Sequence, residues 1–100
     1  VLDERNALGS QGFASVAAAI SSKRKDVVGE VQVEMHGITG GDDDYLVRDA
    51  RNTVKNALKR QLGKGGGQKE LKKAARDALL SLLWERTKQR PMVIVNLLEV

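Results

Sequence analysis

The hydrophobic positions of this 100-residue chain change period along its length, and each period predicts a different element. Residues 27–36 alternate apolar and polar side chains, which predicts a strand with one face toward a core and one toward water. Residues 13–20 also predict a strand, although their alanines would suit a helix. Residues 92–98 are almost continuously apolar, which is typical of a strand buried on both faces.

Two segments between the second and third strands have helical spacing. The first begins at the carboxylates Asp42-Asp43-Asp44, which suit the positive end of a helix dipole. It ends at the glycine-rich run 63–67, because glycine accepts the left-handed conformation of a helix cap. The second runs from about Gln68 to Thr87 and stops before Arg90-Pro91. The apolar stripes are Leu46, Val47, Ala50, Val54, Ala57, Leu58 and Leu62 in the first, and Leu71, Ala74, Ala75, Ala78, Leu79, Leu82 and Leu83 in the second.

The predicted element order is therefore β-β-α-α-β, a fold of the α+β class. We expect both helices to pack on one face of a three-stranded sheet, with the third strand antiparallel to the second. Residues 1–12 are polar and contain Gly9 and Gly12, so we interpret them as the end of a linker and 13–100 as one domain. The chain lacks an initiating methionine, so we expect it to be a fragment of a longer protein.

The composition narrows the chemistry that this chain supports. There is no cysteine, which excludes disulfides and zinc–thiolate sites. The single histidine, His36, falls on the polar face of its strand without the three or four converging ligands of a metal site. Helix capping accounts for Asp42-Asp43-Asp44 more simply than magnesium binding does. We therefore predict no catalytic residue and no metal or cofactor in this chain. No apolar run is long enough to cross a bilayer, so we expect no membrane partner.

Basic residues gather in two places, and the formal net charge is +4. One interpretation is contact with RNA phosphates without base readout, and the other is an ordinary solvated helix face. A short motif, Gly63-Lys64-Gly65-Gly66, resembles the G-x-x-G loop with which KH domains clamp a nucleic-acid backbone. Lys69 stands where that motif expects an apolar residue, and a simple interhelical turn is the favoured interpretation. The candidate RNA contacts are Lys64, Lys69, Lys72, Lys73, Arg76, Arg86, Lys88 and Arg90.

The C-terminal segment carries a family resemblance. Trp84-Glu85-Arg86-Thr87-Lys88-Gln89-Arg90-Pro91-Met92-Val93-Ile94-Val95 resembles the end of ribonuclease J, which closes with a Tyr/Trp-Glu-Lys/Arg-Thr-Lys-x-Arg-Pro-Met pattern and an apolar strand. Gly12-Phe13-Ala14-Ser15-Val16 resembles the first strand of that C-terminal domain, and 28–37 its second. His36 and Ile38 stand where the family usually has Arg and Phe.

The resemblance implies a parent enzyme that joins a metallo-β-lactamase domain to a β-CASP domain. Such enzymes are hydrolases that process and degrade RNA as 5′-to-3′ exonucleases and as endonucleases. It implies two divalent metal ions, zinc being the expected metal, in the parent's catalytic domain, and a cytoplasmic location. It also implies that this C-terminal domain supports oligomerisation, as a dimer or tetramer of the parent, and activity on RNA.

The residues themselves suggest where such self-association occurs. Leu80 and Trp84 lie beside the main stripe of the second helix and widen its apolar face. Exposed apolar surface with a polar rim is typical of a subunit contact. The alternative is that Trp84 only completes the domain's own core. The candidate interface residues are Leu80, Trp84, Met92, Ile94 and Leu98. The alternative function is a KH-like RNA-binding module that uses the Gly63–Gly67 loop.

Overall fold

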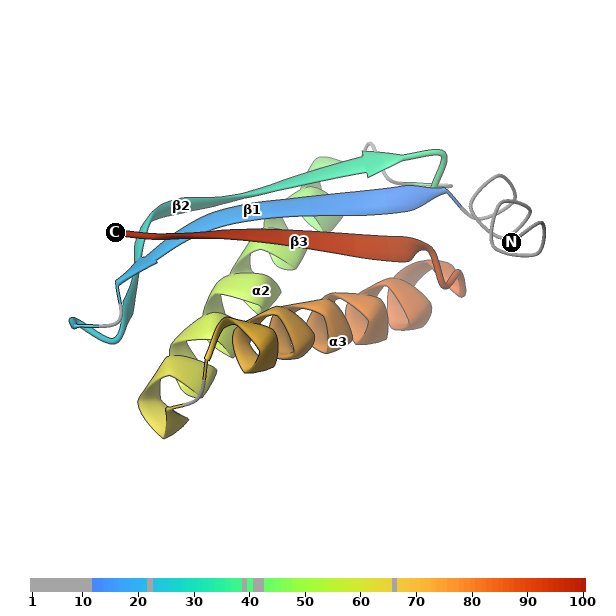
Figure 1. Ribbon diagram of the computed structural model, residues 1–100. Coiled ribbons are helices and arrows are strands. Elements are labelled where there is room, and N and C mark those ends of the chain that lie inside the picture. The colour runs from blue at the N-terminus through green and yellow to red at the C-terminus, as the bar shows by residue number, and fades with distance from the viewer. Residues whose placement is uncertain (1–11, 22, 39, 41–42, 66) are drawn as a thin grey trace.

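The computed structural model describes residues 12–21, 23–38, 40, 43–65 and 67–100. Its elements are β1 (Phe13–Ser21), β2 (Asp26–His36), α2 (Asp44–Lys64), α3 (Gln68–Thr87) and β3 (Met92–Glu99). The predicted α+β class and the order β-β-α-α-β are confirmed (Figure 1). Residues 1–11, most of the predicted linker, lie outside the described residues, so the linker stays a prediction.

The sheet has the order β2-β1-β3, so the first strand is the central one. β1 pairs with β2 in the antiparallel direction and with β3 in the parallel direction. β3 therefore runs antiparallel to β2, as predicted, although β1 lies between them. The chain end is held at the sheet, because the backbone N–H of Val100 donates to the carbonyl of Ile20 at 2.9 Å.

Both helices cover the same face of the sheet, with α2 against β2 and α3 against β3 (Figure 1). The core lies between the sheet and the helices and is aliphatic, as the scarcity of aromatic residues requires. Its largest fully buried side chains are Val16, Ile20, Val54, Leu58, Leu79 and Leu83. The buried residues that α2 and α3 contribute to this core belong to the predicted helical stripes.

Local capping sets the helix ends. The Asp43 carboxylate accepts a hydrogen bond from the Tyr45 backbone N–H at 2.9 Å, which satisfies one of the free donors of the first turn. α3 begins where the Glu70 carboxylate accepts from the Gly67 N–H at 3.0 Å. It ends at Thr87, after which Lys88 takes a left-handed conformation with φ of 58°. The bounds Gln68–Thr87 are those that the sequence predicted, although the left-handed Lys88, before the Arg90-Pro91 pair, already marks the end of the helix.

The expectation that β3 is buried on both faces was wrong. Val93 is buried and Val95 and Leu97 pack partly against the core. The alternate residues Met92, Ile94 and Leu98 are 44%, 45% and 66% exposed. The cause is architectural: both helices lie on one side, so the other face of this edge strand has no covering layer.

Candidate functional site

The uncovered face of the sheet has an apolar side and a polar side. Strand register places Met92 beside Phe13, Ile94 beside Ser15 and Leu98 beside Ala19. On the far side of β1, the same register brings His36, Glu34 and Gln32 onto this face. Apolar surface thus gathers along β3 and polar surface along β2. We call Met92, Ile94 and Leu98 the apolar row.

Phe13 joins the two halves of this face. It is the neighbour of Met92, and its ring stacks on that of His36 with the centroids 4.8 Å apart. The His36 Nε2 atom also lies 3.6 Å from a carboxylate oxygen of Glu34. His36 is therefore engaged in surface contacts, and the described part of the chain contains no group of three or more His, Cys, Asp or Glu side chains placed to hold a metal.

A second surface follows α3 along the free side of β3. Lys69, Lys73, Arg76, Leu80 and Trp84 are spaced by four, three, four and four residues, which places them on one flank of the helix. The flank is basic in its N-terminal half and apolar in its C-terminal half. We call these five residues the α3 flank.

Trp84 lies at the C-terminal end of this flank and is 44% exposed. The guanidinium carbon of Arg90 stands 4.7 Å from the centroid of its ring, and the Lys88 Nζ atom stands 5.5 Å away. Both distances are within the range of cation–π attraction. The indole is thus partly covered by two cations of its own chain, while Leu79 and Leu83 of the same helix fill the core.

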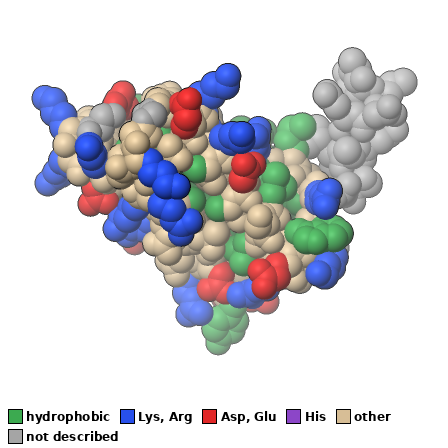
Figure 2. Space-filling model, turned by 90° about the horizontal axis from the view of Figure 1, so that it is seen from below, with side chains coloured by type: hydrophobic (Ala, Val, Ile, Leu, Met, Phe, Trp, Pro, Cys, Tyr) green, Lys and Arg blue, Asp and Glu red, His purple; other side chains and the backbone are tan. Residues whose placement is uncertain are grey.

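A groove separates the basic half of the α3 flank from β3. Its volume is about 290 Å³, and it is lined by Lys69, Lys72, Lys73 and Arg76 along the rim and by Val93 and Val95 along the floor. Figure 2 shows Lys and Arg side chains spread over the helical side of the molecule, with Asp and Glu among them. The groove is the place where such cations meet an apolar floor.

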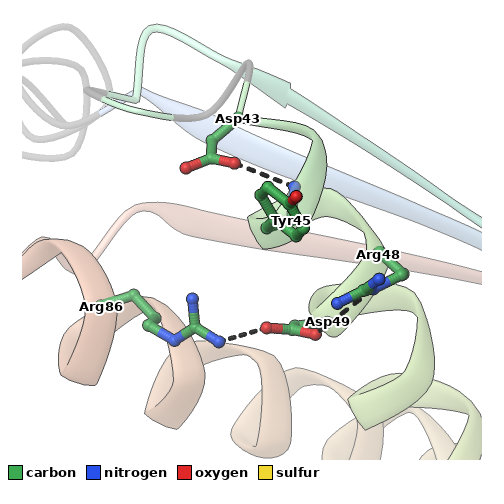
Figure 3. A network of polar contacts seen from close by, with 5 residues as sticks. All are labelled: Asp43, Tyr45, Arg48, Asp49 and Arg86. Atoms are coloured by element: carbon green, nitrogen blue, oxygen red, sulfur yellow. Dashed lines mark hydrogen bonds and ion pairs between the residues drawn. The ribbon is translucent and has the colours of Figure 1, made fainter.

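The remaining candidate RNA contacts have other surroundings. The Arg86 guanidinium donates to the carboxylate of Asp49 on α2, and the Arg48 Nε atom lies 3.8 Å from the same carboxylate (Figure 3). Arg86 therefore links the two helices, whereas Lys88 and Arg90 lie against Trp84. The structure thus divides Arg86, Lys88 and Arg90, which are close together in the sequence, between two structural contacts. Contact of any of these residues with RNA stays a prediction.

The described part of the glycine-rich turn between the helices caps the C-terminal end of α2. α2 extends to Lys64, and Gly65 follows with φ of 87°, a conformation that suits glycine. The Gln61 side-chain amide donates to the Gly65 carbonyl at 2.9 Å. Lys64 is exposed beside this turn. Gly66, part of the G-x-x-G motif, lies outside the described residues.

Comparison with known proteins identifies a family that matches the whole chain. The family model described as the ribonuclease J C-terminal domain matches residues 1–100. The chain belongs to this family. It is also 33% identical over 105 residues to ribonuclease J 2 of Streptococcus pyogenes serotype M3. That alignment covers 100% of the chain and 18% of the relative, so the chain spans less than a fifth of the length of the curated protein it matches.

Within this ribonuclease J C-terminal domain, sequence reasoning found the apolar row but missed the groove. The sequence pattern assigned Val93 and Val95 to the strand and named the α3 cations as candidate RNA contacts or a solvated helix face, without bringing the two sets together. The groove depends on which strand lies above α3, and periodicity does not encode strand order. Phe13 was missed for the same reason, since its pairing with Met92 follows from the parallel register.

In the part of the chain that the structure describes, neither helix combines the length and the hydrophobicity of a membrane span.

Proposed function

We propose that this chain is the non-catalytic C-terminal domain of a longer ribonuclease J, in which it mediates self-association and supports activity on RNA. The parent hydrolyses RNA as a 5′-to-3′ exonuclease and endonuclease in the cytoplasm. Two divalent metal ions, which we expect to be zinc, bind in its catalytic domain. The family match and the small share of the relative that the chain covers support this assignment.

The observation that carries the self-association role is the apolar row on the uncovered face. Its three side chains are about half exposed or more. Full burial of a large apolar side chain is worth about 1.5–3 kcal/mol, so covering the exposed parts contributes roughly 2–5 kcal/mol per subunit. Two subunits together contribute about 5–9 kcal/mol, against an association cost of about 4–15 kcal/mol. We therefore expect the domain alone to associate weakly, and the parent to add further contacts.

Substitution in the parent enzyme tests this role. Ile94→Glu places a charge in the apolar row, whereas Gln32→Glu adds the same charge on the same face at the β2 side. We expect Ile94→Glu to lower both the mass measured by light scattering and the RNA-degrading activity, and Gln32→Glu to leave both near wild type. Unchanged mass and activity for Ile94→Glu, with the domain folded by circular dichroism, would contradict the proposal.

Direct RNA contact at the glycine turn is the second candidate function. Lys64 and Lys69 are both exposed and flank this turn, and Lys69 also lines the groove. Each phosphate contact that is lost lowers the salt dependence of binding by about one unit of log–log slope. We expect Lys64→Gln with Lys69→Gln to weaken RNA binding and lower that slope by about two. The replacement of Gly65 and Gly66 by Asp should abolish binding if the turn clamps the backbone. Unchanged binding in both variants would eliminate the turn as an RNA site.

A further inference from the structure

The two edges of the sheet are built differently. Exposed edges invite pairing with other strands, and natural sheets usually protect them with charges, bulges or proline. β2 carries the exposed carboxylates Asp26, Glu30 and Glu34, and its pairing with β1 has a register shift between Ala17 and Ala19.

β3 has no such protection over most of its length. From Met92 to Leu98 it contains no charged residue, and it pairs with β1 in a continuous parallel register. In a parallel ladder, alternate backbone N–H and C=O groups point away from the neighbouring strand. Since β3 is the last strand of the sheet, half of these groups face outward along an apolar edge. This edge is suited to accept one more strand.

The charges beside the edge specify what kind of strand fits. In the described part of the chain, no ion pair involves Lys69, Lys72 or Lys73, and Arg76 pairs only with its neighbour Asp77 at 3.7 Å. These cations line the groove whose floor is Val93 and Val95. A strand added to β3 would direct every second side chain over this groove.

We propose that the β3 edge binds an extended acidic segment of a partner protein as a fourth strand. Its Asp or Glu side chains face the lysines of α3, and the alternate apolar side chains lie beside the apolar row. The backbone hydrogen bonds of the added strand supply affinity, and the alternating side chains supply specificity. This inference goes beyond self-association, because the added strand lengthens the sheet at its edge while self-association uses the uncovered face.

Other occupants fit the edge less well. A second copy paired β3 to β3 across a two-fold axis would bring two α3 flanks to the same edge, and like charges placed together are unfavourable. RNA phosphates would use the cations and could accept from the outward N–H groups of β3, but they have no donor for the alternating outward C=O groups. The acidic strand uses the charges, the floor and the edge together.

A peptide of alternating glutamate and valine serves as the probe for this site. Its binding to the chain is measured by fluorescence anisotropy, beside a peptide of the same composition with all glutamates in one block. Lys69→Glu with Lys73→Glu reverses two groove charges. Arg51→Glu with Lys55→Glu reverses two charges at the same helical spacing on α2 and serves as the matched control.

We expect the alternating peptide to bind and the block peptide to bind less tightly. The groove variant should lose about tenfold or more in affinity, and the α2 variant should stay near wild type. Hydrogen exchange should show new protection of β3 amides when the alternating peptide binds. Equal binding of both peptides, equal losses in both variants, or unprotected β3 amides would overturn the proposal. So would binding of oligouridine RNA that depends on Lys69 and Lys73 while the peptide fails to bind.

Discussion

Leu79 and Leu80 are adjacent on α3 but have opposite surroundings, and this contrast tests the orientation of the helix. Leu79 is 0% exposed in the core. Leu80 packs only partly against the core and lines a surface hollow with Asp77, Arg90 and Pro91. Replacing either by alanine changes helix propensity by the same small amount, so the difference between the two variants reports packing alone.

The expected magnitudes follow from the burial of the two side chains. Leu79→Ala removes three buried carbon atoms, worth about 2.4 kcal/mol at about 0.8 kcal/mol each. A residual cavity of about 50 Å³ adds about 1.2 kcal/mol, so the total loss is about 3.5 kcal/mol. For Leu80→Ala, where water already reaches the side chain, we expect about 1 kcal/mol.

Urea denaturation followed by far-ultraviolet circular dichroism measures both losses. With a typical slope of about 1–3 kcal/mol per molar urea, Leu79→Ala should lower the midpoint by about 2 M and Leu80→Ala by about 0.5 M. Equal losses, or a larger loss for Leu80→Ala, would refute the orientation of α3 and with it the position of the α3 flank beside β3.

Three further substitutions test local features. Asp43→Ala removes the acceptor for the Tyr45 N–H and should lower the free energy of unfolding by about 1 kcal/mol in a urea titration. Gly12→Ala should be clearly destabilising in a thermal melt, because Gly12 has φ of 74° and a Cβ atom there would lie 2.2 Å from the His36 carbonyl oxygen. Gly40→Ala, at a similar φ of 81° but in open space, should cost less and is the control. Asp49→Ala removes the partner of Arg86 and should cost no more than about 1 kcal/mol, since the pair is partly exposed. That cost should shrink as salt is added, and a larger, salt-independent loss would show that Asp49 acts through packing.

The elements of this fold were predictable because each has a local cause. The alternation in β2, the carboxylates before α2 and the leucine spacing of α3 are all contained within a few neighbouring residues. Strand order is different, because the central position of β1 depends on long-range pairing with both β2 and β3. No periodicity in 13–21 distinguishes a central strand from an edge strand.

The candidate site was predictable only in part, for a related physical reason. The apolar run of β3 indicates burial, but it does not say whether the chain's own helices or another molecule provides the cover. Ile94 and Val95 are both β-branched neighbours, yet one faces the uncovered side and the other faces α3. The pairing of Arg86 with Asp49 joins residues 37 positions apart, so no local pattern indicated it.

The asymmetry of the sheet edges connects these observations to function. The β2 edge has carboxylates and an irregular register, whereas the β3 edge has neither over its apolar run. Such a surface agrees with the proposal that this domain contributes contacts rather than chemistry to a larger enzyme. Under the two proposals above, the uncovered face would serve contact between copies, and the edge with its groove would serve a partner of opposite charge.

Self-association through the apolar row is the central claim, and sedimentation equilibrium of the chain over a wide concentration range tests it most directly. We predict that the wild-type average mass rises with concentration above that of the 10.9 kDa monomer. The Ile94→Glu variant should stay monomeric, and Gln32→Glu should behave as wild type. A wild-type chain that stays strictly monomeric at the highest concentration, or an Ile94→Glu variant that associates as well as wild type, would contradict the account.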